Sequence, residues 1–249
     1  MSAALETRGL CKSFGALVVA QNIDFRLAPG ERHALIGPNG AGKTTFVNML
    51  TGALPPSSGA IFLGGEEVTR VPQSARVRRG LGRTFQVTTL FRSLPALDNV
   101  ALAIAERSGL ATRMWRPAFA HREVKEEAMS HLSALGIADD AATRVADLPY
   151  GKQRLVEIAI ALGLRPKVLL LDEPAAGVPS HESGIILSNL AKLPPEIAIL
   201  IIEHDMDLVF RFAQRITVLV QGAVLVEGPP EEIARDKRVH QVYLGEQHA

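Results

Sequence analysis

Apolar residues in the second half of the chain occur in short continuous runs separated by amphipathic segments. The clearest runs occupy residues 168–171, 197–202 and 216–220. Strands of a parallel sheet covered on both faces are buried on both sides, so they read as continuous apolar runs and do not alternate. The segments between these runs carry apolar positions at helical spacing. This half therefore predicts an α/β fold, with a parallel sheet and helices on both of its faces.

The N-terminal quarter has a different pattern, in which apolar and polar residues alternate. Alternation in 5–10 and 23–27 predicts half-buried strands. The segment between them, Lys12-Ser13-Phe14-Gly15, is typical of a turn. A later apolar run, 61–63, is followed by the turn-forming pair 64–65. These segments predict a small antiparallel β flank beside the parallel sheet.

The middle of the chain, from about 98 to 164, has helical periodicity. The pattern is clearest in 123–135 and 154–164. The predicted strands lie before and after this stretch. We therefore expect the helices to form a lobe inserted into the sheet domain.

Composition and charge narrow the class of protein. The 249 residues suit one large domain, and 47% hydrophobic residues suffice for a core. A net charge of +1 gives no drive toward nucleic acid, so no direct nucleic-acid binding is expected. The single cysteine, Cys11, excludes an intrachain disulfide and favours a reducing compartment. No apolar run reaches the ~18 residues of a membrane helix, and no signal-peptide pattern is present, so we expect no membrane crossing.

A glycine-rich stretch between the apolar run 34–36 and a helical segment matches the phosphate-loop pattern G-x-x-x-x-G-K-[ST]. It reads Gly37-Pro38-Asn39-Gly40-Ala41-Gly42-Lys43-Thr44 and is followed by Thr45. Glycines let such a loop wrap a phosphate with backbone N–H groups, and the helix that follows adds its positive end. Lys43 brings a full positive charge to the phosphates, and the Thr44 hydroxyl is a ligand for Mg²⁺. We predict a nucleotide site here.

Two carboxylates, Asp172 and Glu173, directly follow the apolar run 168–171. An acidic pair at the end of a strand is usually a solvated terminus. Beside a phosphate loop, however, the pair has the chemistry that nucleotide hydrolysis needs, since one carboxylate can hold Mg²⁺ and the other can act on the attacking water. We expect Asp172 to hold Mg²⁺ through its water shell and the catalytic residue Glu173 to orient or deprotonate the attacking water.

A further segment, shortly before these carboxylates, resembles the signature sequence of ABC transporter ATPases. It consists of Leu148, Pro149, Tyr150, Gly151, Lys152 and Gln153. In that family the signature of one subunit closes over the nucleotide held by the phosphate loop of another. The resemblance therefore implies an ATPase that works as a pair of subunits and uses ATP and Mg²⁺.

Other elements resemble the same family, in the family's order. Phe14 matches the aromatic residue that stacks on adenine, with a place in the core as the plain alternative. Gln86 matches the loop glutamine that senses Mg²⁺ and water, and His204 matches the switch histidine that reaches the γ-phosphate. The inter-subunit loop corresponds to Ala176, Gly177, Val178, Pro179 and Ser180. By this resemblance, the catalytic residues are Glu173, His204, Lys43 and Gln86, and the metal contacts are Thr44, Gln86 and Asp172.

The resemblance covers nearly the whole chain and implies a RecA-like P-loop NTPase core within a single domain, 1–249. The nucleotide-binding core with its β flank is expected to span 1–86 and 165–249. The helical sub-domain with the signature is expected to span 87–164.

Four residues depart from the broad family pattern. Pro149 replaces a serine and lacks both a hydroxyl and an N–H group, although its fixed φ suits the first turn of a helix. Tyr150 and Lys152 replace a glycine and a glutamine, and Pro179 replaces an Asp or Asn of the inter-subunit loop. We expect weaker closure over the nucleotide, with the contact through Gly151 preserved.

These departures resemble one branch of the family, the ATPases of branched-chain (hydrophobic) amino acid uptake, and within it the LivG-like subunit. The likeness extends to residues 157–159, 172–177, 202–206 and 242–246. It implies a peripheral protein on the cytoplasmic face of the inner membrane. Its partners would be a second, LivF-like ATPase, two permease subunits and an extracytoplasmic solute-binding protein. Importers of urea and short amides have similar ATPases and stay open as an alternative.

Three rival classes fit less well. A soluble ABC ATPase that acts on nucleic acid or the ribosome usually has a coiled-coil insertion or two ATPase domains in one chain. A GTPase needs an Asn-Lys-x-Asp-like motif to read guanine, and the sequence contains none. A regulatory subunit without activity is disfavoured because Lys43, Asp172, Glu173 and His204 are all present.

A loose basic run precedes the helical stretch. It consists of Arg70, Arg76, Arg78, Arg79 and Arg83. Such a run can bind phosphate or lipid, but we interpret it as a solvated helix face near the permease.

Overall fold

The computed structural model describes residues 2–84, 90–110 and 121–245. In this part of the chain the continuous apolar runs form strands of a six-stranded sheet, in the order β10-β9-β3-β8-β7-β6. The strands are β3 (Arg32–Ile36), β6 (Leu81–Arg83), β7 (Val168–Asp172), β8 (Ala198–Ile202), β9 (Arg215–Val220) and β10 (Ala223–Gly228). All pairings from β9 to β6 are parallel, which confirms the predicted sheet, and β10 is antiparallel to β9.

A smaller antiparallel sheet of order β2-β1-β4-β5 flanks the first, as predicted. Its strands are β1 (Leu5–Phe14), β2 (Leu17–Leu27), β4 (Ser58–Leu63) and β5 (Glu66–Glu67). The turn predicted at 12–15 is wrong in position, because β1 continues to Phe14, which pairs with Leu17. Register shifts interrupt the pairing of β1 with β2. Such bulges break the two-residue alternation, so the second half of β1 does not look like a strand in the sequence.

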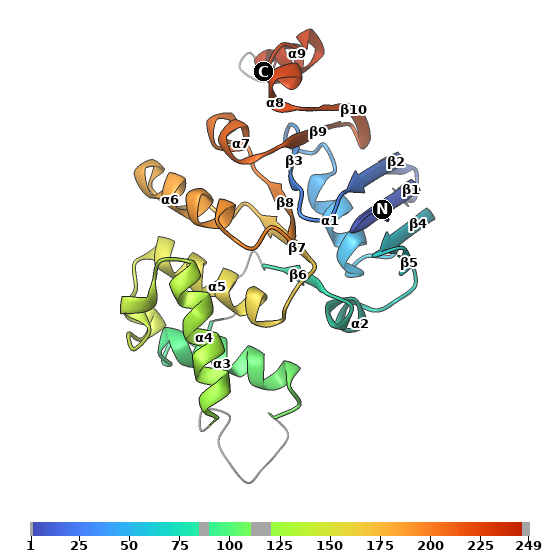
Figure 1. Ribbon diagram of the computed structural model, residues 1–249. Coiled ribbons are helices and arrows are strands. Elements are labelled where there is room, and N and C mark those ends of the chain that lie inside the picture. Colours follow the sequence, from blue (N-terminus) through green and yellow to red (C-terminus); the bar gives the residue numbers. More distant parts are fainter. Residues whose placement is uncertain (1, 85–89, 111–120, 246–249) are drawn as a thin grey trace.

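Helices surround the large sheet and also form a group of their own (Figure 1). The group contains α3 (Ala96–Arg107), α4 (Arg122–Ala134), α5 (Tyr150–Gly163) and the short 3-10 turns Ala138–Asp140 and Val145–Asp147. The other helices are α1 (Lys43–Thr51), α2 (Gln73–Arg78), α6 (Ser180–Ala191), α7 (Met206–Phe212), α8 (Pro230–Ile233) and α9 (Lys237–Gly245). None of the helices in these described ranges has the length and apolar character needed to span a membrane.

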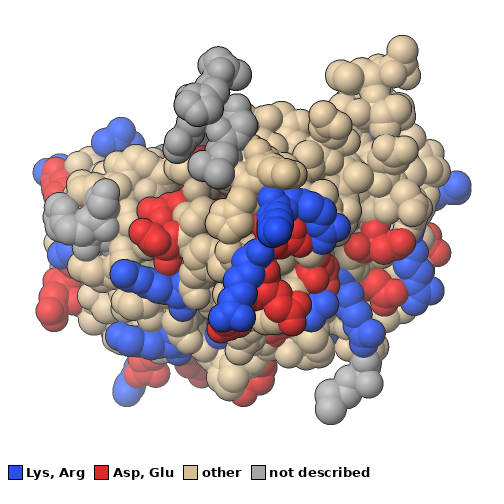
Figure 2. Space-filling model, turned by 90° about the horizontal axis from the view of Figure 1, so that it is seen from above, with Lys and Arg blue, Asp and Glu red and all other residues tan. Residues whose placement is uncertain are grey.

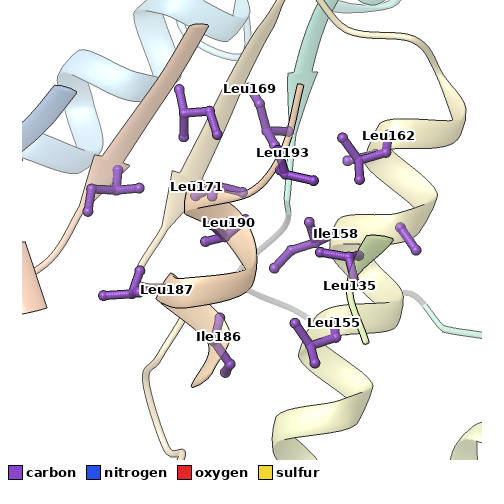
Figure 3. Close-up of a cluster of buried hydrophobic side chains, with 14 of the residues drawn as sticks. Leu135, Leu155, Ile158, Leu162, Leu169, Leu171, Ile186, Leu187, Leu190 and Leu193 are labelled. Atoms are coloured by element: carbon purple, nitrogen blue, oxygen red, sulfur yellow. The ribbon is translucent and has the colours of Figure 1, made fainter. Parts of the chain in front are cut away.

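Alternate residues of the central strands enter two hydrophobic clusters, one on each face of the large sheet. On β7, Leu169 and Leu171 join residues of α5 and α6, as Figure 3 shows. Val168 and Leu170 join the other cluster, which contains residues of α1 and of the antiparallel flank. All four side chains are fully buried. Burial on both faces is the reason that the sequence of β7 is continuously apolar, and each buried leucine contributes about 2 kcal/mol through removal from water.

Arg76 contradicts the interpretation of the basic run as a solvated helix face, because this residue is 1% exposed. Its guanidinium donates to the carbonyl oxygens of Met49 (2.8 Å) and Leu50 (2.6 Å) in the last turn of α1. It also donates to those of Val71 (2.9 Å) and Thr69 (3.0 Å). The last turn of α1 has no basic residue of its own. Arg76 thus adds donors at the C-terminus of α1, where the carbonyl oxygen of Met49 also accepts from the N–H of Gly52 at 3.1 Å. Burial lowers the pKa of Arg76.

An ion-pair cluster joins the three helices of the helical group. Glu127 of α4 accepts two hydrogen bonds from Arg107 at the end of α3, at 2.7 and 2.9 Å. It accepts two more from Arg165, which follows α5, at 3.0 and 3.1 Å. The hydrogen bonds from Arg107, together with those from Arg165, lower the pKa of Glu127 to about 2. Elsewhere on the surface, basic and acidic side chains lie among one another on the face shown in Figure 2.

Candidate nucleotide site

The phosphate-loop segment and the two carboxylates meet at one edge of the large sheet. Strand β8 lies between β3 and β7 and is parallel to both. Ile202, the last residue of β8, pairs with Leu35 on one side and with Asp172 on the other. Gly37 directly follows β3, and His204 lies two residues beyond β8. The predicted groups thus share the carboxyl ends of adjacent parallel strands, where ligands bind in open α/β sheets.

Two glycines of the loop hold backbone positions that a side chain would not fit. Gly37 has a φ of 153°, and a Cβ there would lie 2.1 Å from the carbonyl oxygen of Leu219. Gly42 has a φ of 99°, and a Cβ there would lie 2.6 Å from the carbonyl oxygen of Val19. The loop therefore packs closely against β9 and β2. This tight path is what turns successive N–H groups toward a bound phosphate.

Lys43 lies across the start of its own loop. Its Nζ donates to the carbonyl oxygens of Gly37 (2.5 Å) and Pro38 (2.9 Å). Helix α1 begins at Lys43, and no side chain caps its N-terminus, since Gly42 is the N-cap residue. The first-turn N–H groups and the Lys43 ammonium therefore offer a positive surface for phosphate. Among the other loop residues, Asn39, Gly40 and Thr44 are exposed, Pro38 and Thr45 are half-buried, and Ala41 is buried.

Asp172 is the buried member of the acidic pair, with 5% of its surface exposed. Its Oδ2 lies 3.2 Å from Nη2 of Arg83, the last residue of β6. Nη1 of Arg83 donates to Oδ1 of Asn48 in α1, at 2.8 Å. The interpretation of Arg83 as part of a solvated face is therefore wrong as well. Its ion pair exists because β6 lies beside β7, and no periodic pattern in the sequence marks that adjacency.

Glu173 has a backbone conformation that is unusual for a residue with a side chain. Its φ is 47°, in the left-handed region, and its N–H donates to the carbonyl oxygen of Ile202 at 2.9 Å. Backbone strain of this kind occurs preferentially at functional sites. The Glu173 side chain is 34% exposed, and its Oε1 lies 3.8 Å from Nδ1 of His204. The structure thus brings together the predicted base and the predicted switch histidine.

Glu203 is a buried carboxylate of the site that sequence reasoning missed. Its side chain is 2% exposed, and its Oε1 accepts a hydrogen bond from the N–H of Ala175 at 3.1 Å. Its Oε2 lies 3.9 Å from Nδ1 of His204. Burial raises the pKa of Glu203 above its usual value. The only signal in the sequence is its position beside His204.

Phe14 lies at the end of β1 with 51% of its surface exposed, which excludes a place in the core. The ammonium of Lys12 lies 4.9 Å from the centre of its ring. Leu17, across the hairpin turn, is exposed as well. An exposed aromatic ring with a cation near it can accept a flat base by stacking.

The signature segment opens helix α5, as predicted. Pro149 is the N-cap residue, in an extended conformation, and Tyr150 is the first helical residue. Pro149 is therefore not in the first turn, but its carbonyl oxygen accepts from the N–H of Gln153 at 3.0 Å. Lys152 donates to both carboxylate oxygens of Asp140, at 2.9 and 2.7 Å. Leu148 and Gly151 are buried.

The signature segment contacts the predicted inter-subunit loop within one chain. Gly177 has a φ of 75°, and a Cβ on it would lie 3.1 Å from Cε1 of Tyr150. Pro179 is the N-cap residue of α6, which begins at Ser180. Ala176 and Val178 are half-buried in the same loop. Two segments that the family resemblance predicts therefore lie side by side.

The oxygen ligands at this edge of the sheet fit Mg²⁺. The Thr44 hydroxyl and the Asp172 carboxylate are hard oxygen donors, and Mg²⁺ commonly uses one or two such side chains together with phosphate oxygens and water. The structure contains no group of three or more His, Cys, Asp or Glu side chains arranged for a metal, as far as the described residues show. Gln86, the third predicted contact, lies outside the described residues.

A phosphate loop between a parallel strand and a helix, with an acidic pair at the end of a nearby strand, defines a P-loop nucleoside triphosphatase. Residues 20–176 match the family model described as ABC transporter, and residues 223–249 match the model described as branched-chain amino acid ATP-binding cassette transporter. The chain belongs to the family of ABC transporter ATP-binding proteins. It binds and hydrolyses ATP through this cassette.

Relatives and a solved structure agree with this assignment. The chain is 39% identical to the high-affinity branched-chain amino acid transport ATP-binding protein BraF of Pseudomonas aeruginosa, over 97% of this chain and 98% of the relative. It is 38% identical to LivG of Escherichia coli K12, a protein with the same description, over the same shares. The chain also resembles a crystal structure of an ABC transporter ATP-binding cassette in its ADP conformation, with a TM-score of 0.86 and 28% sequence identity. The match covers 98% of this chain and 100% of the chain in that structure.

Proposed function

We propose that the chain is the ATP-driven motor of an importer for branched-chain or other hydrophobic amino acids. The observation that carries the cargo assignment is the match of residues 223–249 to the model of branched-chain amino acid cassettes. The described part of this region contains β10, α8 and α9. The transport function in the names of the two relatives supports the same cargo.

The proposed motor has a nucleotide-binding core, 1–86 and 165–249, and a helical sub-domain, 87–164. The grouping of α3, α4 and α5 apart from the antiparallel flank supports this division (Figure 1). The antiparallel flank supplies Phe14 at the end of β1. The sub-domain supplies the signature segment at the start of α5.

In the proposed site, each group acts on a different part of the nucleotide. The Phe14 ring stacks on adenine, while the backbone N–H groups of 37–45 and the Lys43 ammonium hold the phosphates. Thr44, Asp172 and Gln86 would hold Mg²⁺, which when bound offsets the charge of the phosphate oxygens.

Hydrolysis in the proposed mechanism depends on the pair of Glu173 and His204. Glu173 accepts a proton from the attacking water. His204 donates a hydrogen bond to the γ-phosphate, where negative charge is rearranged during transfer. The 3.8 Å separation of the two side chains supports their joint action at one phosphate.

Transport in this proposal requires a second ATPase subunit. The signature segment 148–153 closes over the partner's nucleotide, and the loop 176–180 lies between the subunits. Because Pro149 has neither a hydroxyl nor an N–H group, closure depends on the N–H of Gly151. The other partners are two permease subunits and an extracytoplasmic solute-binding protein, and the motor works at the cytoplasmic face of the membrane. The contact of Tyr150 with Gly177 supports coupling between the two segments.

Uptake in the native cells tests the proposal. The chromosomal gene is replaced by one that encodes Glu173→Gln, or the control Glu196→Gln, which makes the same chemical change at an exposed residue before β8. Uptake of labelled leucine, valine, urea and acetamide is then measured. We expect Glu173→Gln to abolish uptake of leucine and valine only, and Glu196→Gln to change nothing.

Each other result has a defined meaning. Loss of urea or acetamide uptake alone would keep the motor but contradict the amino acid cargo. Unchanged uptake of all four solutes in cells that contain the Glu173→Gln protein would contradict the proposed importer.

A further inference from the structure

We propose that Arg83 is a positioning residue that occupies Asp172 as a stand-in cation until the carboxylate takes up Mg²⁺ together with a nucleotide. The inference rests on the proposed nucleotide site and adds a residue outside the phosphate loop and the acidic pair. Three elements meet at this point: α1 supplies Asn48, β6 supplies Arg83 and β7 supplies Asp172.

Burial makes a counter-charge necessary for Asp172. Its side chain is 3% exposed and that of Arg83 is 11% exposed. An ionised carboxylate this far from water is costly unless a cation or several hydrogen-bond donors compensate it. Within the described part of the chain, Arg83 provides the ion pair of Asp172. A cation is thus in place at a carboxylate that is predicted to serve a metal.

The geometry of the Arg83–Asp172 ion pair is that of a weak contact, which a metal ion can replace. Only Nη2 of Arg83 donates to Asp172, at 3.2 Å, and its buried Nε has no hydrogen-bond partner among the described residues. The Arg107–Glu127 pair of the same chain is bidentate, at 2.7 and 2.9 Å. Bidentate pairs with short bonds are the strong ones. By this comparison Arg83 holds Asp172 loosely.

Asn48 gives the guanidinium a second anchor that does not depend on the carboxylate. Nη1 of Arg83 donates to the neutral Oδ1 of Asn48 at 2.8 Å, a shorter contact than the one to Asp172. Arg83 can therefore stay on α1 when Asp172 turns to a metal.

Two cations that share one carboxylate also repel each other. Arg83 accordingly opposes free Mg²⁺, and the ion is taken up when nucleotide phosphates add their own negative charge. The Mg²⁺ requirement for nucleotide binding should therefore be higher with Arg83 than without it.

The test uses the purified full chain and a non-hydrolysable ATP analogue. Analogue binding is titrated with Mg²⁺ for the wild type, Arg83→Met, Arg83→Lys and the exposed control Arg78→Met. We expect Arg83→Met to lower the half-saturating Mg²⁺ concentration by about three- to tenfold, as expected when a buried charge no longer competes. Arg83→Lys should stay near the wild type because it keeps the charge, and Arg78→Met should match the wild type.

Thermal unfolding separates this role from a purely structural one. Arg83→Met should lower the Tm of the Mg²⁺-free protein more than the Tm of the protein with Mg²⁺ and analogue, because only the first state needs the stand-in cation. Equal losses of Tm in both states, or an unchanged or raised Mg²⁺ requirement, would overturn the inference.

A second variant is expected to change the Mg²⁺ requirement in the opposite direction. Asn48→Ala removes the neutral hydrogen-bond acceptor of Arg83, so that the guanidinium interacts with Asp172 alone. The half-saturating Mg²⁺ concentration should therefore rise. A fall would contradict the inference, and this variant keeps the inference testable if Arg83→Met does not fold. A wild-type chain that binds the analogue equally well with and without Mg²⁺ would instead contradict the proposed metal site.

Discussion

Nδ1 of His204 lies 3.8 Å from Oε1 of Glu173, and the two residues follow adjacent strands. The left-handed φ of 47° at Glu173 costs roughly 1–3 kcal/mol for a residue with a side chain. The adjacent strand helps to hold this conformation, since the Glu173 N–H donates to Ile202. The fold therefore maintains a strained residue at the point where the proposed chemistry needs a base.

The first prediction concerns this base. Glu173→Gln keeps the shape of the side chain but removes its ability to accept a proton, so turnover should fall about 100- to 10,000-fold. ATP binding should be retained. Phosphate release at saturating MgATP and equilibrium binding of labelled ATP measure the two effects, with Glu196→Gln as the control. Near-normal turnover would remove Glu173 from the role of base.

Stacking on Phe14 is tested by its removal. Phe14→Ala should raise the Kd for ATP about 5- to 150-fold, which corresponds to the roughly 1–3 kcal/mol of a stacked base. The free energy of unfolding should change little because the ring is half exposed. Phe14→Trp should bind ATP as well as the wild type. A loss of stability with unchanged affinity would contradict the stacking role.

The contact between Tyr150 and Gly177 can be measured by a double-mutant cycle. Gly177→Ala puts a methyl group against the Tyr150 ring and strains a φ of 75°, so it should destabilise the chain by about 1–3 kcal/mol. Tyr150→Ala should relieve the steric part, so the double variant should be more stable than the sum of the single effects. Urea unfolding gives the coupling energy. Strict additivity would show that only backbone strain acts at Gly177.

Arg76 and Arg78 both lie in α2, but Arg76 is buried and Arg78 is exposed, so their substitutions can be compared. Arg76→Met removes the guanidinium donors to the carbonyl oxygens of Met49 and Leu50, of which Met49 keeps the N–H of Gly52, so the free energy of unfolding should fall by about 2–4 kcal/mol. Arg78→Met removes an exposed side chain and should cost less than about 0.5 kcal/mol. Urea unfolding of the two variants gives the comparison. Equal small effects would mean that water replaces the Arg76 bonds.

The ion-pair cluster around Glu127 predicts a pH dependence of stability. The pKa of Glu127 is lowered from 4.5 to about 2 in the folded state. At a pH above 4.5, the pKa of the unfolded state, the cluster therefore makes its full contribution to the stability of the fold. This contribution is lost as the pH falls toward 2. Glu127→Gln should therefore cost about 1–2 kcal/mol at pH 7, after allowance for partial solvent screening. The difference from wild type should shrink between pH 5 and pH 3. Urea unfolding over this range measures it, and a constant difference would contradict the assignment.

Much of the fold and of the site was predictable from the sequence because the responsible patterns are local. The continuous run 168–171 reflects burial on both faces of β7, and the loop 37–44 carries its own chemistry. The second half of β1 was not predictable, since its register shifts remove the alternation on which strand prediction depends.

Apart from the turn at 12–15, the errors concern residues whose surroundings come from distant parts of the chain. Arg76 and Arg83 resemble surface residues in the sequence, but α1 lies beside the first and β7 beside the second. Glu203 is buried by the loop that contains Ala175. Only the packed structure determines which charged side chains are covered.

The pairing of Ile202 with both Leu35 and Asp172 has a consequence for sequence divergence. The spacing between the phosphate loop and the acidic pair is set by the backbone hydrogen bonds of β8, which do not depend on side-chain identity. Substitutions among the apolar residues of β8 can therefore accumulate, provided that volume is kept, while the site retains its dimensions. An insertion or deletion within β8 would shift the register on both sides at once, so we expect length to be preserved in this strand more strictly than sequence.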